Sequence, residues 1–167
     1  AFASVDLSPN DMCDFTRGND YRAILWSTKT AKPKFLFEHK TRVVKLKLDH
    51  RGKRLFTAGT LGNAQIWSAE TGEKLVPLDL NKREYVISAV SFSHDGRYIA
   101  TGAPGRDISL WDAQSGKRIQ QFKARTRQQG KPSGAIVYAV GFDQSLKHII
   151  SETSAGYGEK WQITEQQ

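Results

Sequence analysis

Three observations predict an all-β protein built from one repeated sheet. Trp26, Trp67, Trp111 and Trp161 are spaced 41, 44 and 50 residues apart. Each of these tryptophans belongs to a similar phrase, and the four phrases are RAILWS, NAQIWS, DISLWD and YGEKWQ. No stretch carries apolar residues at the period of about 3.6 that marks an amphipathic helix. A repeat of about 40–50 residues is typical of propeller blades and solenoid units.

The third repeat shows most clearly how one unit is divided into strands. Val90 and Phe92 alternate with small or polar neighbours, which is the period-2 pattern of a strand. His94-Asp95-Gly96 follows as a turn, because Asp-Gly is a strong hairpin signal. The four predicted strands are 89–93, 97–101, 107–111 and 117–122. Four antiparallel strands joined by tight turns make one blade of a β-propeller.

Applied along the chain, this pattern predicts about four blades. We assign the units to residues 2–38, 39–80, 81–123 and 135–167, with a long basic loop at 123–134 between the last two. The fourth unit reaches only the turn after its third strand, so we expect this blade to lack its outer strand. Propellers have about four to eight blades. We therefore expect a segment of a larger propeller, closed by the remainder of the same chain or by a second copy; a compact four-bladed ring is the remaining alternative.

The third unit resembles a WD repeat. It carries the turn motif as SHDG, the Leu-Trp-Asp ending at 110–112 and the Ser-Gly-Lys turn at 115–117. The second unit is similar, with IWS in place of the full dipeptide, whereas the first and fourth units are more degenerate. The resemblance covers nearly the whole chain and implies a propeller of about seven blades, most often a non-enzymatic scaffold for protein assemblies. The PSGAIVYAVGF run at 132–142 is similar to bacterial WD-repeat proteins.

The resemblance also implies a hydrogen-bond network of a His, an Asp, a Ser or Thr and the Trp of each blade. Asp20 matches the Asp position of the first unit and His39 the His position of the second. The second unit has Leu61 where the Asp is expected, so we expect an incomplete network there. The structural positions of the repeat are therefore Trp26, Trp67, Trp111, Trp161, Asp20, His39, Asp95 and Gly96.

Several patterns suggest chemistry and are better explained by the repeat. Ser93, His94 and Asp95 are the residue types of a hydrolase triad, but adjacent side chains in a turn diverge, whereas a triad needs converging groups. Gly-rich loops such as GTLGN join strand to strand, whereas phosphate-binding loops lead into a helix. The single cysteine, Cys13, excludes an internal disulfide and a cysteine-ligated zinc site. We expect no catalytic residues, metal or cofactor.

Charge is the one feature that points towards partners. The chain has 25 Lys and Arg against 17 Asp and Glu, a net charge of +8, which favours acidic partners. In a propeller, the loops after the second and fourth strands gather at one end, and here these loops hold most of the excess cations. The candidate partner-binding residues are Arg42, Arg83, Arg106, Arg125, Arg127 and Lys131.

These features together predict a non-catalytic scaffold that binds an acidic protein surface. One alternative is a nucleic-acid-associated module that uses the basic loops, although no aromatic residues are interleaved there for base stacking. The other is an accessory domain of a larger enzyme or sensor. No apolar run approaches the roughly 18 residues of a membrane span. The compartment stays open between the cytoplasm and a bacterial membrane-associated or periplasmic location.

Overall fold

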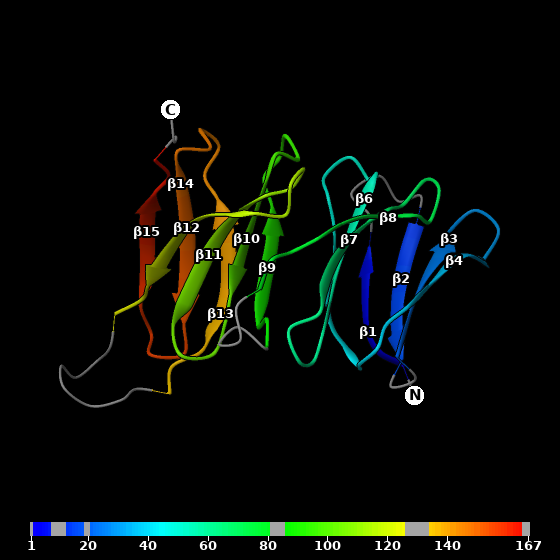
Figure 1. Cartoon of the computed structure of the whole chain (residues 1–167), viewed down its shortest axis with the longest axis horizontal. Helices are drawn as coiled ribbons and strands as arrows, with labels where there is room; N and C mark the ends of the chain where they lie inside the picture. The colour runs from blue at the N-terminus through cyan, green and yellow to red at the C-terminus, as the bar shows by residue number, and fades with distance from the viewer. Residues whose placement is uncertain (1, 8–12, 19–20, 81–85, 126–133, 165–167) are drawn as a thin grey trace. The chain divides into compact units, whose positions relative to one another are not determined.

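The computed structural model describes residues 2–7, 13–18, 21–80, 86–125 and 134–164, and the described residues contain strands and no helix (Figure 1). Within the described residues, short turns join successive strands of each sheet, as the repeat predicts. Their bounds are β1 Phe2–Leu7, β2 Cys13–Gly18, β3 Arg22–Ser27, β4 Lys32–Glu38, β5 Val43–Leu48, β6 Arg54–Gly59, β7 Ala64–Ser68, β8 Lys74–Pro77, β9 Ala89–Phe92, β10 Tyr98–Gly102, β11 Asp107–Asp112, β12 Arg118–Lys123, β13 Val137–Phe142, β14 His148–Thr153 and β15 Gly158–Gln162.

The strands form four antiparallel sheets in which neighbours in sequence are neighbours in space. Blade 1 is β1–β4, blade 2 is β5–β8, blade 3 is β9–β12 and blade 4 is β13–β15, which has three strands in the part of the chain that the structure describes. The register of blades 1, 2 and 3 shifts at the same place, just before the Trp of the third strand. The predicted all-β fold, a partial propeller with an incomplete fourth blade, is confirmed.

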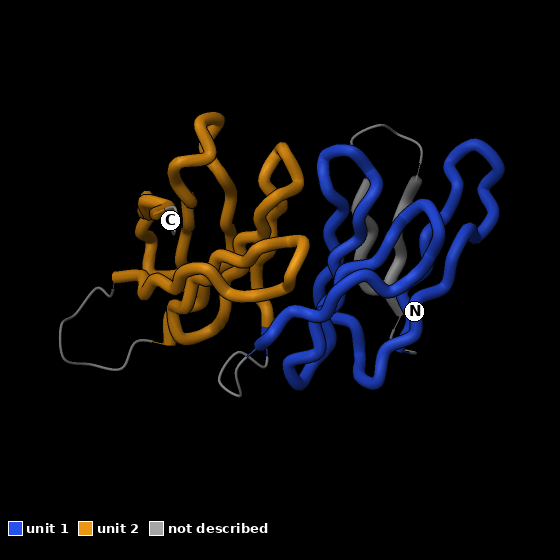
Figure 2. Tube along the Cα trace, turned by 45° about the horizontal axis from the view of Figure 1, so that its top comes forward, with its two compact units in different colours: residues 1–86 blue, residues 87–167 orange. Residues whose placement is uncertain are grey.

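The chain divides into two compact units, residues 1–86 and 87–167, each of which holds two blades (Figure 2). This division falls after residue 86, within the third of the four units assigned from the sequence (81–123), and those assignments themselves stay a prediction. The predicted basic loop lies largely outside the described residues, at 126–133. No helix in the described residues is long and apolar enough to cross a membrane.

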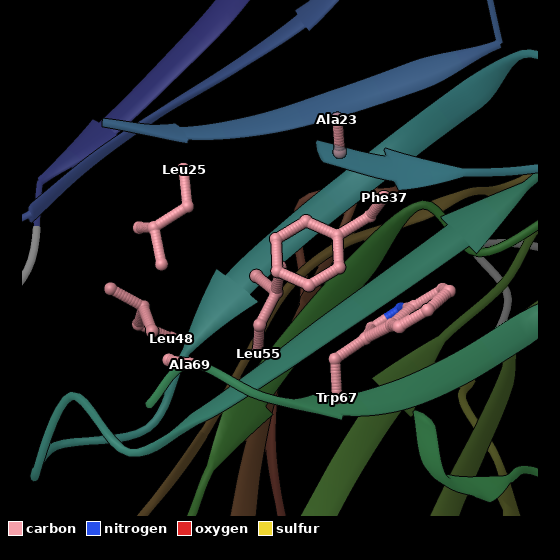
Figure 3. Packing of buried hydrophobic residues seen from close by; sticks show 7 residues of the cluster. All are labelled: Ala23, Leu25, Phe37, Leu48, Leu55, Trp67 and Ala69. Carbon is pink, nitrogen blue, oxygen red and sulfur yellow. The ribbon is translucent and has the colours of Figure 1, made fainter. Parts of the chain in front are cut away.

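In the first unit, blades 1 and 2 share a buried apolar cluster (Figure 3). Phe37 and Trp67 pack with their ring centroids 5.0 Å apart in a tilted arrangement. Such aromatic pairs contribute about 0.5–1.5 kcal/mol beyond the area that they bury. The cluster consists of Ala23, Leu25 and Phe37 from blade 1 and Leu48, Leu55, Trp67 and Ala69 from blade 2.

The second unit repeats this arrangement between blades 3 and 4. Its cluster contains Tyr98, Ala100, Ile108 and Leu110 from blade 3, and Ala124, Val137 and Ile149 from the chain that follows. Phe122 and Trp161 lie at its margin with their rings 5.3 Å apart. Burying each large aliphatic side chain contributes roughly 1.5–3 kcal/mol, so these faces hold the blades of each unit together.

The turn after the first strand is closed by a side chain at one fixed position in blades 2, 3 and 4. Asp49 Oδ1 accepts hydrogen bonds from the N–H groups of Lys53 and Arg54, at 2.7 and 3.0 Å. Ser93 and Asp143 occupy the corresponding positions of blades 3 and 4, directly after β9 and β13. Side chains that bind nearby backbone N–H groups make such turns favourable. The ends of the blades are therefore held firmly.

Candidate interaction site

The tryptophans that mark the repeat are fixed by a hydrogen bond across each sheet. All four lie in the third strand of their blade. In three blades the indole N–H donates a hydrogen bond to a hydroxyl on the second strand. A buried hydrogen bond of this kind is electrostatically stronger than one in water and fixes the position of the indole. The pairs are Trp67 with Thr57 at 2.7 Å, Trp111 with Thr101 at 2.8 Å and Trp161 with Ser151 at 2.8 Å.

His39 lies against the tryptophan of blade 2. Its imidazole meets the indole of Trp67 edge-on, with ring centroids 5.7 Å apart. The Nε2 atom is buried, and none of the described residues forms a hydrogen bond with it. Leu61, the residue found where an Asp is expected, is 68% exposed and adopts a positive φ of 72°. Asp20, the corresponding residue of blade 1, lies outside the described residues.

The Ser93-His94-Asp95 sequence forms a turn, as predicted. The hydroxyl of Ser93 donates to Asp95 Oδ1 at 2.6 Å and accepts from the N–H of Tyr98 at 2.8 Å. His94 is exposed and makes no hydrogen bond to the serine in this turn. Gly96 takes the positive φ of 75° that the turn requires. Both hydrogen bonds of the Ser93 hydroxyl therefore close the turn.

Three of the six candidate partner-binding residues are described. Arg42 is exposed in the connection between β4 and β5, and Arg125 is exposed after β12. Arg106 is half-buried in the turn between β10 and β11. Arg83, Arg127 and Lys131 lie outside the described residues. Because Arg42 belongs to the first unit and the other two to the second, a shared basic face stays a prediction.

Two of these arginines also have local partners. Arg106 donates from one guanidinium nitrogen to the carbonyl oxygen of Ala124 at 2.7 Å, and its Nε is buried without a partner. The guanidinium of Arg125 lies 3.4 Å from a carboxylate oxygen of Glu159, whose side chain is only 10% exposed. Arg106 therefore has a structural role, whereas Arg125 keeps most of its side chain in solvent.

A pocket of about 250 Å³ in the first unit was not predicted from the sequence. We call it the His39 pocket. It forms where the end of β4, the turn between β6 and β7, and β8 meet, so residues distant in sequence line it. The lining residues are Glu38, His39, Lys40, Gly62, Asn63, Ala64, Gln65, Trp67, Lys74, Pro77 and Leu78. Two lining residues, His39 and Trp67, were singled out from the sequence as positions of the repeat, but no pattern indicated a pocket beside them.

The His39 pocket has a positive electrostatic character. The ammonium group of Lys74 lies 5.3 Å from the centroid of the Trp67 ring, over its face. Burial and, to a lesser extent, the nearby charge of Lys74 together lower the pKa of His39 to about 4. The imidazole is therefore neutral at pH 7, and the pocket combines two lysines with an uncharged histidine.

The described residues contain no group of three or more His, Cys, Asp or Glu side chains placed to hold a metal ion. His50 and His94 are exposed in separate turns, and His148 is the first residue of β14. His148 is engaged by Asp143, whose Oδ2 lies 2.8 Å from its Nδ1.

Comparison with known proteins agrees with the repeat. The family model described as WD domain, G-beta repeat matches residues 80–112, which cover the first three strands of blade 3. Transducin beta-like protein 2 of Homo sapiens is 26% identical over 135 residues, which is 80% of this chain and 30% of that protein. Eukaryotic translation initiation factor 3 subunit I of Taeniopygia guttata is 27% identical over 127 residues, 76% of this chain and 36% of that protein.

A third relative is more similar over a shorter stretch. The U3 snoRNP-associated protein-like YAOH of Oryza sativa subsp. japonica is 32% identical over 105 residues, 53% of this chain and 20% of that protein. The chain thus spans between a fifth and somewhat over a third of these three relatives. Among solved structures, the computationally designed Ika4 protein superposes with a TM-score of 0.77 at 21% identity, over 98% of this chain and 92% of that one. This likeness shows the fold.

Proposed function

Because this chain belongs to the WD-repeat β-propeller family, we propose that it is a non-catalytic scaffold whose basic loops bind an acidic surface of a partner protein. WD-repeat relatives such as a translation initiation factor subunit support a scaffold role in general terms. The acidic partner and the loops that bind it are the new part of this proposal.

The proposal rests mainly on two arginines whose backbones are held in place while their side chains are exposed. Arg42 and Arg125 occupy the same kind of connection, between the fourth strand of one blade and the first strand of the next. The carbonyl oxygen of Arg42 accepts from the N–H of Thr60 at 2.9 Å, and the N–H of Arg125 donates to Glu159 at 2.9 Å. Both backbones are held while both side chains are exposed. Cations presented on a firm scaffold suit an interaction surface.

Exposed charges at the rim of an interface mainly govern the association rate and its salt dependence. Their reach is limited by screening over about 8 Å at physiological ionic strength. The test therefore measures association kinetics. The whole chain first recovers its partner from a lysate of the source cell, and the purified partner is then measured against variants.

The informative variant combines Arg42→Glu with Arg125→Gln, which avoids placing a new carboxylate beside Glu159. We expect partner association to slow by roughly tenfold at low salt, with little difference at high salt. The matched control combines Arg51→Glu with Lys117→Gln. Both control positions are exposed in turns at the opposite end of their blades, after β5 and after β11. Equal slowing by the control pair would reject a role for the basic loops.

The nucleic-acid alternative is tested with the same variants. If the basic loops bind phosphates, single-stranded RNA associates with a steep salt dependence that the Arg42 and Arg125 changes reduce. An accessory role in a larger enzyme or sensor stays a prediction, because the chain spans less than half of the relatives compared above.

A further inference from the structure

We propose that the His39 pocket receives the carboxylate of an Asp or Glu side chain from the partner polypeptide, between Lys40 and Lys74. This inference deepens the proposed function and rests on it, because it assigns a second, more specific contact to the same acidic partner. It uses residues that the basic-loop proposal does not.

The balance of charge in the pocket favours an anion. Its charged lining residues are Glu38, Lys40 and Lys74. Glu38 is compensated from outside the pocket, since one of its carboxylate oxygens lies 3.7 Å from the guanidinium of Arg22. Neither lysine has an ion-pair partner within the described ranges. Two ammonium groups with their charge uncompensated attract a carboxylate, and charge-assisted hydrogen bonds are stronger than neutral ones.

The turn beside the pocket lacks the acid that blade 1 has at the same register. Leu61 lies six residues before Trp67, and Asp20 lies six residues before Trp26. The Leu side chain points largely into solvent, being 68% exposed, and leaves His39 Nε2 buried without a partner. An unsatisfied buried polar atom costs about 1–3 kcal/mol. We expect a carboxylate from the partner to lie near the His39 imidazole, whose Nε2 forms no hydrogen bond with the described residues.

The volume of the pocket fits a side chain better than a cofactor. Sites for drug-sized molecules enclose about 300–1,000 Å³. At about 250 Å³, the His39 pocket is below that range but large enough for a carboxylate group and its methylene stem. Because Nε2 is covered by protein atoms, the ligand first pairs with the lysines, and a bond to the imidazole requires the ring to turn.

The pKa of His39 is expected to change when a carboxylate occupies the pocket. A carboxylate nearby stabilises the imidazolium, so binding raises the pKa of His39 from its value of about 4. The complex then binds a proton more readily than the free protein. By linkage, affinity for the carboxylate rises as the pH falls from 7 towards 5, above the range where Asp and Glu side chains themselves become protonated.

The experiment titrates the whole chain with a short acetylated and amidated peptide of Gly, Ser and Glu, and follows the His39 ring and the Trp67 indole by NMR. We expect saturable shifts at both residues and a raised His39 pKa. The Lys74→Gln change is expected to weaken the affinity for the peptide by roughly threefold to tenfold. Lys53→Gln is the matched control, because Lys53 is another exposed lysine of blade 2 that does not line the pocket and lies 3.5 Å from Glu70.

Three results of the titration reject the proposal. Absence of shifts at His39 and Trp67 rejects a carboxylate site. Acetate that binds as well as the peptide shows a small-anion site, and tighter binding of inorganic phosphate shows a phosphate site. Unchanged thermal unfolding of Lys74→Gln verifies that the variant is folded. A failure here while the Arg42 and Arg125 variant still slows the partner rejects only the pocket, whereas the reverse result rejects only the basic loops.

Discussion

Blades 3 and 4 follow the same backbone plan and differ at the residue just before the tryptophan. In β11, Leu110 precedes Trp111 and is fully buried in the cluster that joins the two blades. In β15, Lys160 precedes Trp161, and its side chain is 57% exposed, 3.5 Å from Asp143. Because successive side chains on a strand alternate between faces, each of these residues lies on the face opposite to its tryptophan.

The cross-strand neighbours extend this difference over the whole face. Ala100 pairs with Leu110 in blade 3, and Ile150 pairs with Lys160 in blade 4. Ile150 is 48% exposed and Tyr138 on the same sheet is 51% exposed, whereas Ala100 is buried. The tryptophan therefore indicates the position and register of the third strand. The residue before it indicates whether the opposite face of the sheet is buried or exposed.

Placing a lysine at position 110 and a leucine at position 160, each in a separate variant, is expected to change the free energy of unfolding by the largest and most unequal amounts. Leu110→Lys places an unpaired charge at a fully buried position and is expected to destabilise the chain by about 5 kcal/mol. Lys160→Leu is expected to change stability by less than about 0.5 kcal/mol, since the site is exposed. Urea denaturation of both variants measures this. Comparable losses would show that the two faces are covered alike.

Removing the tryptophans tests the other face of the same strands. Trp111 is fully buried, so Trp111→Ala is expected to cost roughly 3–5 kcal/mol. Trp161 is only partly buried beside Phe122, and Trp161→Ala is expected to cost about half as much. The midpoints of chemical denaturation provide the measurement. A larger loss for Trp161→Ala than for Trp111→Ala would contradict the burial difference.

The repeat explains why the fold was predictable from the sequence. Strand positions depend on local alternation and turn residues, and the same phrase recurring around Trp67 and Trp111 fixes their place in the blade. The chemistry of Ser93 and Asp95 was predictable for the same reason, because a turn engages its own side chains. The fourth tryptophan also lies in the third strand of an antiparallel sheet, although the polar Lys160 precedes it.

The sites were less predictable because they depend on contacts between distant residues. The partner of Arg125, Glu159, is 34 residues away in the chain and is contributed by another strand. The His39 pocket depends on how β8 brings Lys74 over Trp67, which no local pattern records. Loop cations could be counted from the sequence, but their partners could only be found in three dimensions.

The turns that follow the first strands of blades 3 and 4 use the same two residue types in exchanged places. In blade 3, Ser93 donates to Asp95, whereas in blade 4, Ser145 donates to Asp143 at 3.0 Å. The double change Ser93→Asp with Asp95→Ser converts one arrangement into the other. We expect it to cost less than about 1 kcal/mol, while Ser93→Asp alone costs more because two carboxylates then share the turn. Thermal unfolding of the single and double variants measures the coupling, and additive losses would disprove the exchange.

The smallest expected effect is the pH dependence that Asp143 confers on blade 4. Desolvation alone raises the pKa of this carboxyl, but hydrogen bonds from His148 and Ser145, together with the backbone N–H of His148, outweigh it and hold the pKa well below its ordinary value. A pKa that is lower in the folded than in the unfolded state stabilises the fold above the unfolded value of about 4. That contribution is lost as the pH falls through the acidic range towards the folded pKa. Asp143→Asn is therefore expected to lower stability at pH 7 slightly and to flatten its decline between about pH 5 and pH 2. Asp79→Asn, at an exposed position after β8, is the control and should leave the decline intact. If Asp143→Asn and wild type lose stability in parallel on acidification, the turn of blade 4 does not depend on an ionised carboxylate, and its likeness to the turn of blade 3 is limited to backbone geometry.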